Sequence, residues 1–222
     1  MQITKDMCIG ASEAHVVNLD ATFKAHKDAI KAFLALKDKL KTRGFSLDIA
    51  SAFRDFARQE LIFDSKYNGI RPVFNKDNEK LDLSSMSSLK RVESICIFSA
   101  IPGFSRHHFG SEFDIYSKDL LPQGQSLQLS AFEYLENGYF HSLYCSLKDL
   151  INDFDFYMPY GQDGSLKMGF EPWHISYKPV ASKFIEAFDI DYALDYIMSK
   201  NHPWSQACCD YAKENFKTML AI

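Results

Sequence analysis

Ser-Arg-His-His-Phe-Gly-Ser-Glu-Phe-Asp, from Ser105 to Asp114, is the stretch that decides how this chain is interpreted. It places the imidazole of His107 seven residues before the carboxylate of Asp114. If residues 110–116 form a strand, these two side chains would point to opposite faces of one continuous strand. They can share a ligand only if His107 lies on a loop that curls back, and the Pro-Gly pair at residues 102–103 favours such a loop.

A second stretch, Glu-Pro-Trp-His from Glu171 to His174, supplies another carboxylate and another imidazole. Two His and one Asp are suitable ligands for Zn²⁺, and a catalytic zinc site has three protein ligands and one open position. We expect His107, Asp114 and His174 to be these ligands, which leaves Glu171 as the base for an attacking water. Because a regular strand would point Glu171 and His174 to opposite faces, we expect Pro172 to distort it.

An upstream segment places an arginine at the junction of a strand and a helix. Residues 45–54 alternate as a strand, and Asp55 is expected to cap a helix that runs to about Tyr67. Arg54 therefore lies where the strand ends, although taken alone it is more typical of a surface salt bridge. Gln59, one turn into the helix, is expected to be structural.

The hydrophobic pattern predicts an α+β fold, in which a small antiparallel sheet carries the metal site and helices pack on it. Strands are expected near Phe45, Ser111, Asp153 and Met168. Helices are expected over residues 19–43, 181–198 and 204–220. Residues 161–164 are expected to form the turn of a hairpin. At this length we expect a single domain, 1–222.

The three segments together resemble the VanY-type D-alanyl-D-alanine carboxypeptidases. The Ser-x-His-x-x-Gly-x-x-x-Asp pattern and the later Glu-Pro-Trp-His resemble the motifs of that family, and residues 51–59 resemble its Ser-Gly-Tyr-Arg segment with a downstream Gln. The segments follow the family's order over residues 45–178, which the resemblance marks as the family core. The wider group of zinc peptidases includes D-Ala-D-Ala dipeptidases, phage peptidoglycan endopeptidases and the Hedgehog domain.

The resemblance implies a function and a role for each site residue. It implies a Hedgehog/DD-peptidase-like fold and a zinc-dependent hydrolase that removes the terminal D-Ala of peptidoglycan peptides. It implies that Arg54 contacts the substrate and stabilises the oxyanion, and that Ser105 binds the polar end of the substrate. Glu171 is then the residue that takes a proton from the zinc-activated water.

Other functions stay open at this point. The same group includes peptidases that cut free D-Ala-D-Ala dipeptide, L,D bonds or internal wall bonds. A non-catalytic zinc-bearing binding module is a further alternative, but the presence of both Glu171 and Arg54 favours an enzyme. A closed structural zinc site would need His108 or Glu112 as a fourth ligand. We otherwise expect His108 behind the ligands or facing the substrate, and Glu112 either lining the pocket or paired with a basic residue.

Composition excludes several classes of partner. The net charge of −4 gives no basic footprint, so we expect no nucleic-acid partner. No apolar run reaches the length of a membrane span, and the first ten residues lack the features of a secretory signal. Five Cys at irregular spacing do not indicate a disulfide framework. We therefore expect a cytoplasmic protein, or a periplasmic or cell-wall protein if a leader has been removed.

Overall fold

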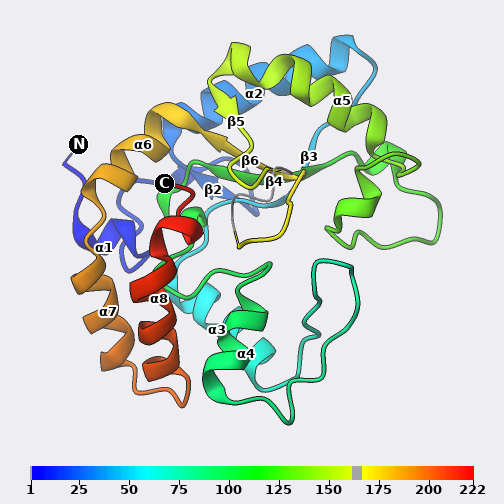
Figure 1. Cartoon of the computed structure of the whole chain (residues 1–222). Helices are drawn as coiled ribbons and strands as arrows, with labels where there is room; N and C mark the ends of the chain where they lie inside the picture. Colours follow the sequence, from blue (N-terminus) through cyan, green and yellow to red (C-terminus); the bar gives the residue numbers. More distant parts are fainter. Residues whose placement is uncertain (1, 162–166) are drawn as a thin grey trace.

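A four-stranded antiparallel sheet lies at the centre of the computed structural model, which describes residues 2–161 and 167–222 (Figure 1). The strand order is β3-β4-β6-β5. The strands are β3 (Asp48–Ser51), β4 (Glu112–Tyr116), β5 (Phe156–Tyr157) and β6 (His174–Tyr177). The predicted α+β fold class is confirmed.

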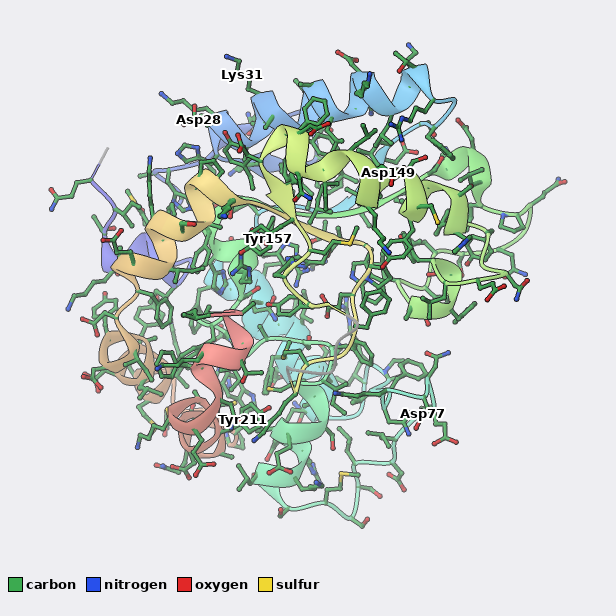
Figure 2. All side chains as sticks on the ribbon, turned by 45° about the horizontal axis from the view of Figure 1, so that its top comes forward. Asp28, Lys31, Asp77, Asp149, Tyr157 and Tyr211 are labelled. Carbon is green, nitrogen blue, oxygen red and sulfur yellow. The ribbon has the colours of Figure 1, made fainter. Side chains whose placement is uncertain are left out.

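One face of the sheet is covered by two helices (Figure 1). They are α2 (Lys27–Thr42) and α5 (His141–Leu150). Phe33 of α2 stacks on Phe113 of β4 with ring centroids 4.6 Å apart, inside an apolar cluster that both helices share with the sheet. The outer side of α2 is charged, and Asp28 and Lys31 point away from the sheet (Figure 2). The apolar stripe of α2 therefore holds this layer to the sheet.

The other face of the sheet looks toward a second group of helices (Figure 1). The group consists of α3 (Phe56–Tyr67), α4 (Ser88–Ile95), α7 (Ile190–Ser199) and α8 (Ser205–Met219). Its core includes the fully buried Trp204, whose ring lies edge-on to Phe63 at 5.2 Å. Because β4 sends Phe113 and Ile115 to the α2 side, its polar residues Glu112 and Asp114 face the space between the two layers.

Short elements complete the described part of the chain. They are α1 (Lys5–Cys8), α6 (Lys178–Ala187) and the 3₁₀ turns η1 (Arg106–Phe109), η2 (Lys118–Leu120), η3 (Ala131–Glu133) and η4 (Ile151–Phe154). No helix within residues 2–161 and 167–222 has the length and apolar character needed to cross a bilayer.

The helix predicted for residues 19–43 is wrong in its first part, because α2 begins only at Lys27. The preceding residues form a hairpin of β1 (Val17–Asn18) and β2 (Lys24–Ala25). The Asp20 carboxylate accepts hydrogen bonds from the backbone N–H groups of Thr22 and Phe23. This local bonding stabilises a turn where apolar periodicity alone favoured a helix.

Other predicted bounds also shift. The helix predicted for residues 181–198 is two helices, because the Asp189 side chain accepts the N–H of Tyr192 and starts α7. The strand predicted over residues 45–54 is shorter than expected, because β3 covers only Asp48–Ser51. The two later strands are also shorter and begin only at Phe156 and His174. The predicted helix over residues 204–220 is confirmed as α8, whereas the hairpin turn predicted at residues 161–164 lies largely outside the described residues.

Gly110 turns the chain from η1 into β4. Its φ of +69° lies in the left-handed region that favours glycine, and its carbonyl oxygen accepts the N–H of His26 at 2.8 Å. A Cβ atom here would lie 2.5 Å from Val16 Cγ1 and 3.1 Å from the His26 nitrogen. The β1–β2 hairpin therefore packs too closely for a side chain at this position.

We predict that Gly110→Ala lowers the free energy of unfolding more than Gly44→Ala does. Gly44 also has a positive φ, +87°, but a Cβ there meets nothing within 4 Å. The control therefore carries only the backbone cost of about 1–2 kcal/mol. Crowding at Gly110 should add about 1–3 kcal/mol. Chemical denaturation measures both losses, and equal values would contradict the close packing of the hairpin.

Candidate metal centre

Two neighbouring strands place a carboxylate and an imidazole side by side. Asp114 of β4 is the register partner of His174 at the start of β6. The two side chains meet with His174 Nδ1 3.2 Å from Asp114 Oδ1. Because the next residue of each strand, Ile115 and Ile175, packs into the α2 layer, this pair must lie on the opposite face of the sheet.

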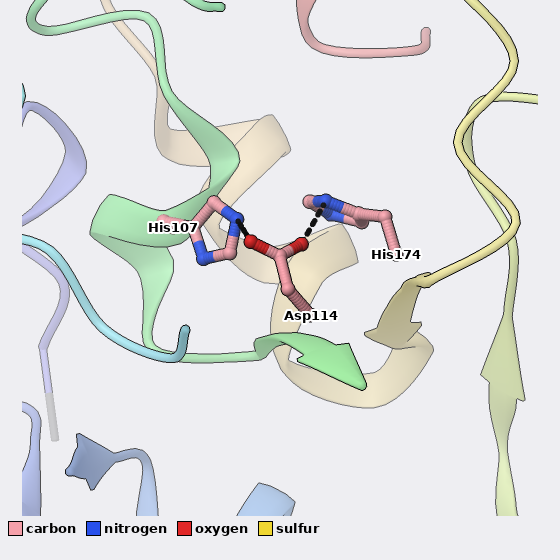
Figure 3. Close-up of side chains that lie close together, drawn as sticks. All are labelled: His107, Asp114 and His174. Atoms are coloured by element: carbon pink, nitrogen blue, oxygen red, sulfur yellow. Dashed lines mark ion pairs between the residues drawn. The ribbon is translucent and has the colours of Figure 1, made fainter. Parts of the chain in front are cut away.

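His107 reaches the same point from η1, and Gly110 then returns the chain to β4, which confirms the loop that the spacing required. His107 Nε2 lies 3.3 Å from Asp114 Oδ2. Ligand atoms of His107, Asp114 and His174 all lie within 4.8 Å of one another, and all three residues are buried (Figure 3). The structure therefore brings the three predicted ligands together.

The donor set fits one zinc ion. The outer nitrogen of each ring already has a partner, because His107 Nδ1 lies 2.7 Å from the Ala52 carbonyl oxygen and His174 Nε2 lies 2.8 Å from Glu112 Oε2. Each ring can thus present its other nitrogen to a metal. Asp114 Oδ1 is buried and accepts no hydrogen bond from the described residues. Three such ligands leave one coordination position open, as in catalytic zinc sites.

A closed structural zinc site is not supported by the described residues. Neither His108 nor Glu112 belongs to the group of potential ligands. His108 uses both ring nitrogens elsewhere, since Nδ1 lies 2.7 Å from the Arg54 carbonyl oxygen and Nε2 accepts the N–H of Gly103 at 3.1 Å. His108 therefore lies behind Arg54, where it holds the backbone of that residue, and does not face the substrate.

Glu112 forms a fully buried ion pair with Arg106, at 3.3 Å between Oε1 and Nη2. The hydroxyls of Ser111 and Ser176 donate to the same oxygen at 2.7 and 2.8 Å. Burial alone would raise the pKa of Glu112, but the charge of Arg106 and the hydrogen bond from His174 hold it at about 2. Of the two roles left open for Glu112, pairing with a basic residue is confirmed. The resulting carboxylate orients the ring of a ligand.

Arg106 is a residue that the sequence reasoning missed. Its Nη1 donates to the carbonyl oxygen of Leu220 at 2.6 Å, and its Nη2 donates to Tyr157 Oη and Ser176 Oγ, both at 2.7 Å. The end of α8 is thereby tied to the metal centre. The only signal in the sequence was an arginine beside a ligand histidine, six residues before Glu112.

Arg54 lies at the predicted junction and points at the centre. Its Nη2 donates to Asp114 Oδ2 at 3.0 Å, its Nε to Ser51 Oγ at 2.9 Å and its Nη1 to Gln59 Oε1 at 3.0 Å. Asp55 caps α3, as expected, and Gln59 is fully buried in a structural role. The guanidinium is therefore held by three partners beside a ligand carboxylate.

Glu171 lies in a turn immediately before β6 and not on the strand. The N–H of His174 donates to the Glu171 carbonyl oxygen at 3.0 Å, so a turn, and not a strand distorted at Pro172, brings both side chains to the centre. Glu171 Oε2 lies 3.5 Å from His174 Nδ1. Burial raises the pKa of Glu171 to about 7, which is suited to a group that accepts and returns a proton.

A cavity of about 1020 Å³ opens over the centre. Ser105, Arg54 and Glu171 line it together with the three metal ligands. Residues 71–78 form part of its outer wall. The predicted substrate-binding and catalytic residues thus share one cavity.

The sequence model of the VanY family, D-alanyl-D-alanine carboxypeptidase, matches residues 22–180. The chain belongs to the VanY family. Two uncharacterized proteins of Haemophilus influenzae are similar to this VanY-family chain. One is 46% identical over 95 residues, which is 42% of this chain and 70% of the relative. The other is 37% identical over 105 residues, which is 46% of this chain and 72% of the relative.

Solved structures share the VanY-like fold. VanYB in complex with D-alanine-D-alanine is 17% identical, with a TM-score of 0.56 over 83% of this chain and 90% of that one. A VanY variant in complex with Zn(II) is 18% identical, with a TM-score of 0.54 over 81% and 88%. The LdcB LD-carboxypeptidase is 22% identical, with a TM-score of 0.52 over 83% and 78%. The family and the His–Asp–His centre together identify a VanY-family zinc peptidase.

We predict that Glu112→Gln weakens zinc binding by about 10- to 100-fold, because the substitution removes the charge that orients His174 and leaves Arg106 unpaired. Glu133→Gln is the matched control, since Glu133 is equally buried but accepts hydrogen bonds from a loop instead of a metal ligand. Competition with a chromogenic chelator measures both affinities. An unchanged zinc affinity for Glu112→Gln would show that the carboxylate does not support the ligand.

Zinc binding should also release a proton from His174. Burial alone would lower the pKa of His174 in the metal-free protein, but the neighbouring carboxylates of Asp114 and Glu112 outweigh it and raise the pKa to about 9. The ring therefore carries a proton below this pH and loses it as the pH rises through about 9, whereas a metal ligand must be deprotonated. Calorimetry in buffers of different ionisation enthalpy measures the number of protons that zinc binding releases. This number should be smaller at about pH 9.5 than at about pH 7.5, by most of one proton. A constant number would contradict this assignment.

Proposed function

We propose that this VanY-family protein is a zinc D-alanyl-D-alanine carboxypeptidase that removes the terminal D-Ala of peptidoglycan peptides. The observation that carries the proposal is the position of Glu171. Its carboxylate lies 3.5 Å from the ligand His174, outside the group of potential ligands, and its pKa is about 7. A zinc-bearing binding module has no need of such a base, so Glu171 favours an enzyme.

The residues around the centre have separate tasks. When held by the three ligands, zinc supplies Lewis-acid polarisation of the scissile carbonyl and acidifies the attacking water. Glu171 accepts the proton of that water and passes it to the leaving amine. Arg54 donates to the developing oxyanion, a contribution that is commonly about 3–4 kcal/mol. Ser105 offers its hydroxyl to the polar end of the peptide from the cavity wall.

The choice of bond is supported by the relatives. The family is described by D-alanyl-D-alanine carboxypeptidase activity, and VanYB was solved with D-alanine-D-alanine. The cavity of about 1020 Å³ admits more than a dipeptide, which favours a peptide substrate over free D-Ala-D-Ala. A second candidate is L,D-carboxypeptidase activity, which the similarity to the LdcB LD-carboxypeptidase supports.

The test combines zinc analysis with D-Ala release from a muramyl pentapeptide and the matching tetrapeptide. We expect one zinc ion in both the wild type and Glu171→Ala. D-Ala release from the pentapeptide should fall by about 10²- to 10⁴-fold in Glu171→Ala, because the base is lost. Glu214→Ala removes an exposed carboxylate of α8 and should retain activity.

Each other outcome has a definite meaning. Release of D-Ala from the tetrapeptide alone would replace the proposal with L,D-carboxypeptidase activity. Zinc binding without release from either peptide would contradict the substrate class. Failure to bind zinc after reconstitution would contradict the metal centre itself.

A further inference from the structure

Three of the basic side chains that line the cavity have no bonded partner among the residues that the structure describes. They are Arg58, Lys66 and Arg71. Within residues 2–161 and 167–222, none of their side chains makes a hydrogen bond or an ion pair. Arg54 and Arg106 line the same cavity but already form ion pairs, with Asp114 and Glu112 respectively. The cavity thus offers cationic groups that form no hydrogen bond or ion pair with the described protein groups.

Lys66 is the most buried of the three. Arg58 and Arg71 are exposed, whereas Lys66 is half-buried. Arg58, Ile62 and Lys66 follow one another at four-residue intervals along α3, and all three line the cavity. One face of this helix therefore turns toward the cavity and directs the Lys66 ammonium into it.

The ammonium of Lys66 lies near the groups that would carry out the reaction. Burial lowers the pKa of Lys66 to about 8, while the charge of Glu171 opposes this shift and the charges of Arg54 and Arg71 add to it. Lys66 therefore keeps its proton at pH 7 although water solvates it poorly. A desolvated cation without a bonded partner costs free energy, which an anionic group of a ligand would offset.

We propose that Lys66, with Arg71 beside it, binds the terminal carboxylate of the substrate. In a carboxypeptidase substrate this carboxylate lies one residue beyond the scissile carbonyl, a distance of about 3.5 Å along the chain. Glu171 and Arg54 would flank that carbonyl, and both lie close enough to Lys66 for their charges to act on it. Lys66 lines the same cavity as these two residues, so the leaving residue of a bound peptide would lie between the metal centre and cationic groups of the wall.

This subsite would separate two of the alternatives that the sequence leaves open. An ordinary α-linked peptide bond inside a chain has no free carboxylate one residue beyond the scissile carbonyl, so a cation at that point favours cleavage before a terminal residue over cleavage of such an internal bond. The inference rests on the proposed function, because it assumes that the metal centre hydrolyses a peptide.

The test uses the zinc-loaded protein and one acyl-D-Ala-D-Ala peptide in two forms, as the free acid and as the C-terminal amide. Lys66→Met removes the charge, Lys66→Arg keeps it, and Lys37→Met is the control that removes an exposed charge of α2 outside the cavity. We expect Lys66→Met to raise KM for the acid by about 10- to 100-fold, as for a lost hydrogen bond to a charged group, with a smaller change in kcat. Turnover of the amide should be poor and unchanged by the substitution, and Lys66→Arg should retain most of the affinity for the acid.

Two results would overturn the inference while leaving the proposed function intact. An active wild type with the same KM in Lys66→Met would show that the ammonium does not contact substrate. Equal losses on the acid and the amide, mainly in kcat, would show that Lys66 acts only through Glu171. Circular dichroism and zinc content would establish that Lys66→Met is folded. If Lys66→Met does not fold, KM of Lys66→Arg for the acid provides an independent measurement.

A wild type that hydrolyses neither form would contradict the proposed function. Binding of the acid and the amide to zinc-loaded Glu171→Ala would then decide the carboxylate subsite alone. If the Glu171→Ala protein binds the acid more tightly than the amide, and adding Lys66→Met abolishes this preference, the subsite is supported. Binding without preference, or no binding, would overturn it.

Discussion

The metal centre depends on the ion pair between Arg106 and Glu112, from which solvent is excluded. Two charges in such a place are stable only when each is paired and its remaining hydrogen-bonding capacity is satisfied. Ser111, Ser176 and Tyr157 satisfy it here. The second oxygen of Glu112 accepts from Arg106 Nε at 3.3 Å and also lies 2.8 Å from the outer nitrogen of His174. A carboxylate that is costly to bury therefore sets the orientation of an imidazole at the centre.

The metal ligands and the base could be predicted because short motifs carry them, and their residue types restrict the chemistry. His107, Asp114 and His174 meet as the spacing required, and Glu171 lies beside them. The partner of Glu112 could not be predicted in the same way. Arg106 and Glu112 meet only because η1 folds back onto a sheet in which β4 and β6 are in register, and register is a property of the folded chain.

The α+β class followed from the pattern of strands and helices, but the bounds of the elements depended on local hydrogen bonds. Apolar periodicity continued upstream of α2, yet the Asp20 turn bonds stopped the helix there. Periodicity also ran through Asp189, where a side-chain cap starts a new helix. The position of charged residues could not be predicted from composition either. The net charge of −4 does not indicate that Arg58, Lys66 and Arg71 lie together on one cavity wall.

The hydrogen bond from Arg106 to the Leu220 carbonyl oxygen joins residues that are 114 positions apart. A contact of this sequence separation forms late, because a long loop must close before it is made. During synthesis, the arginine that supports the metal centre leaves the ribosome long before the last turn of α8 exists. The order of synthesis therefore leaves the hydrogen bonding of Arg106, which supports Glu112 behind the ligand His174, incomplete until the closing helix has docked.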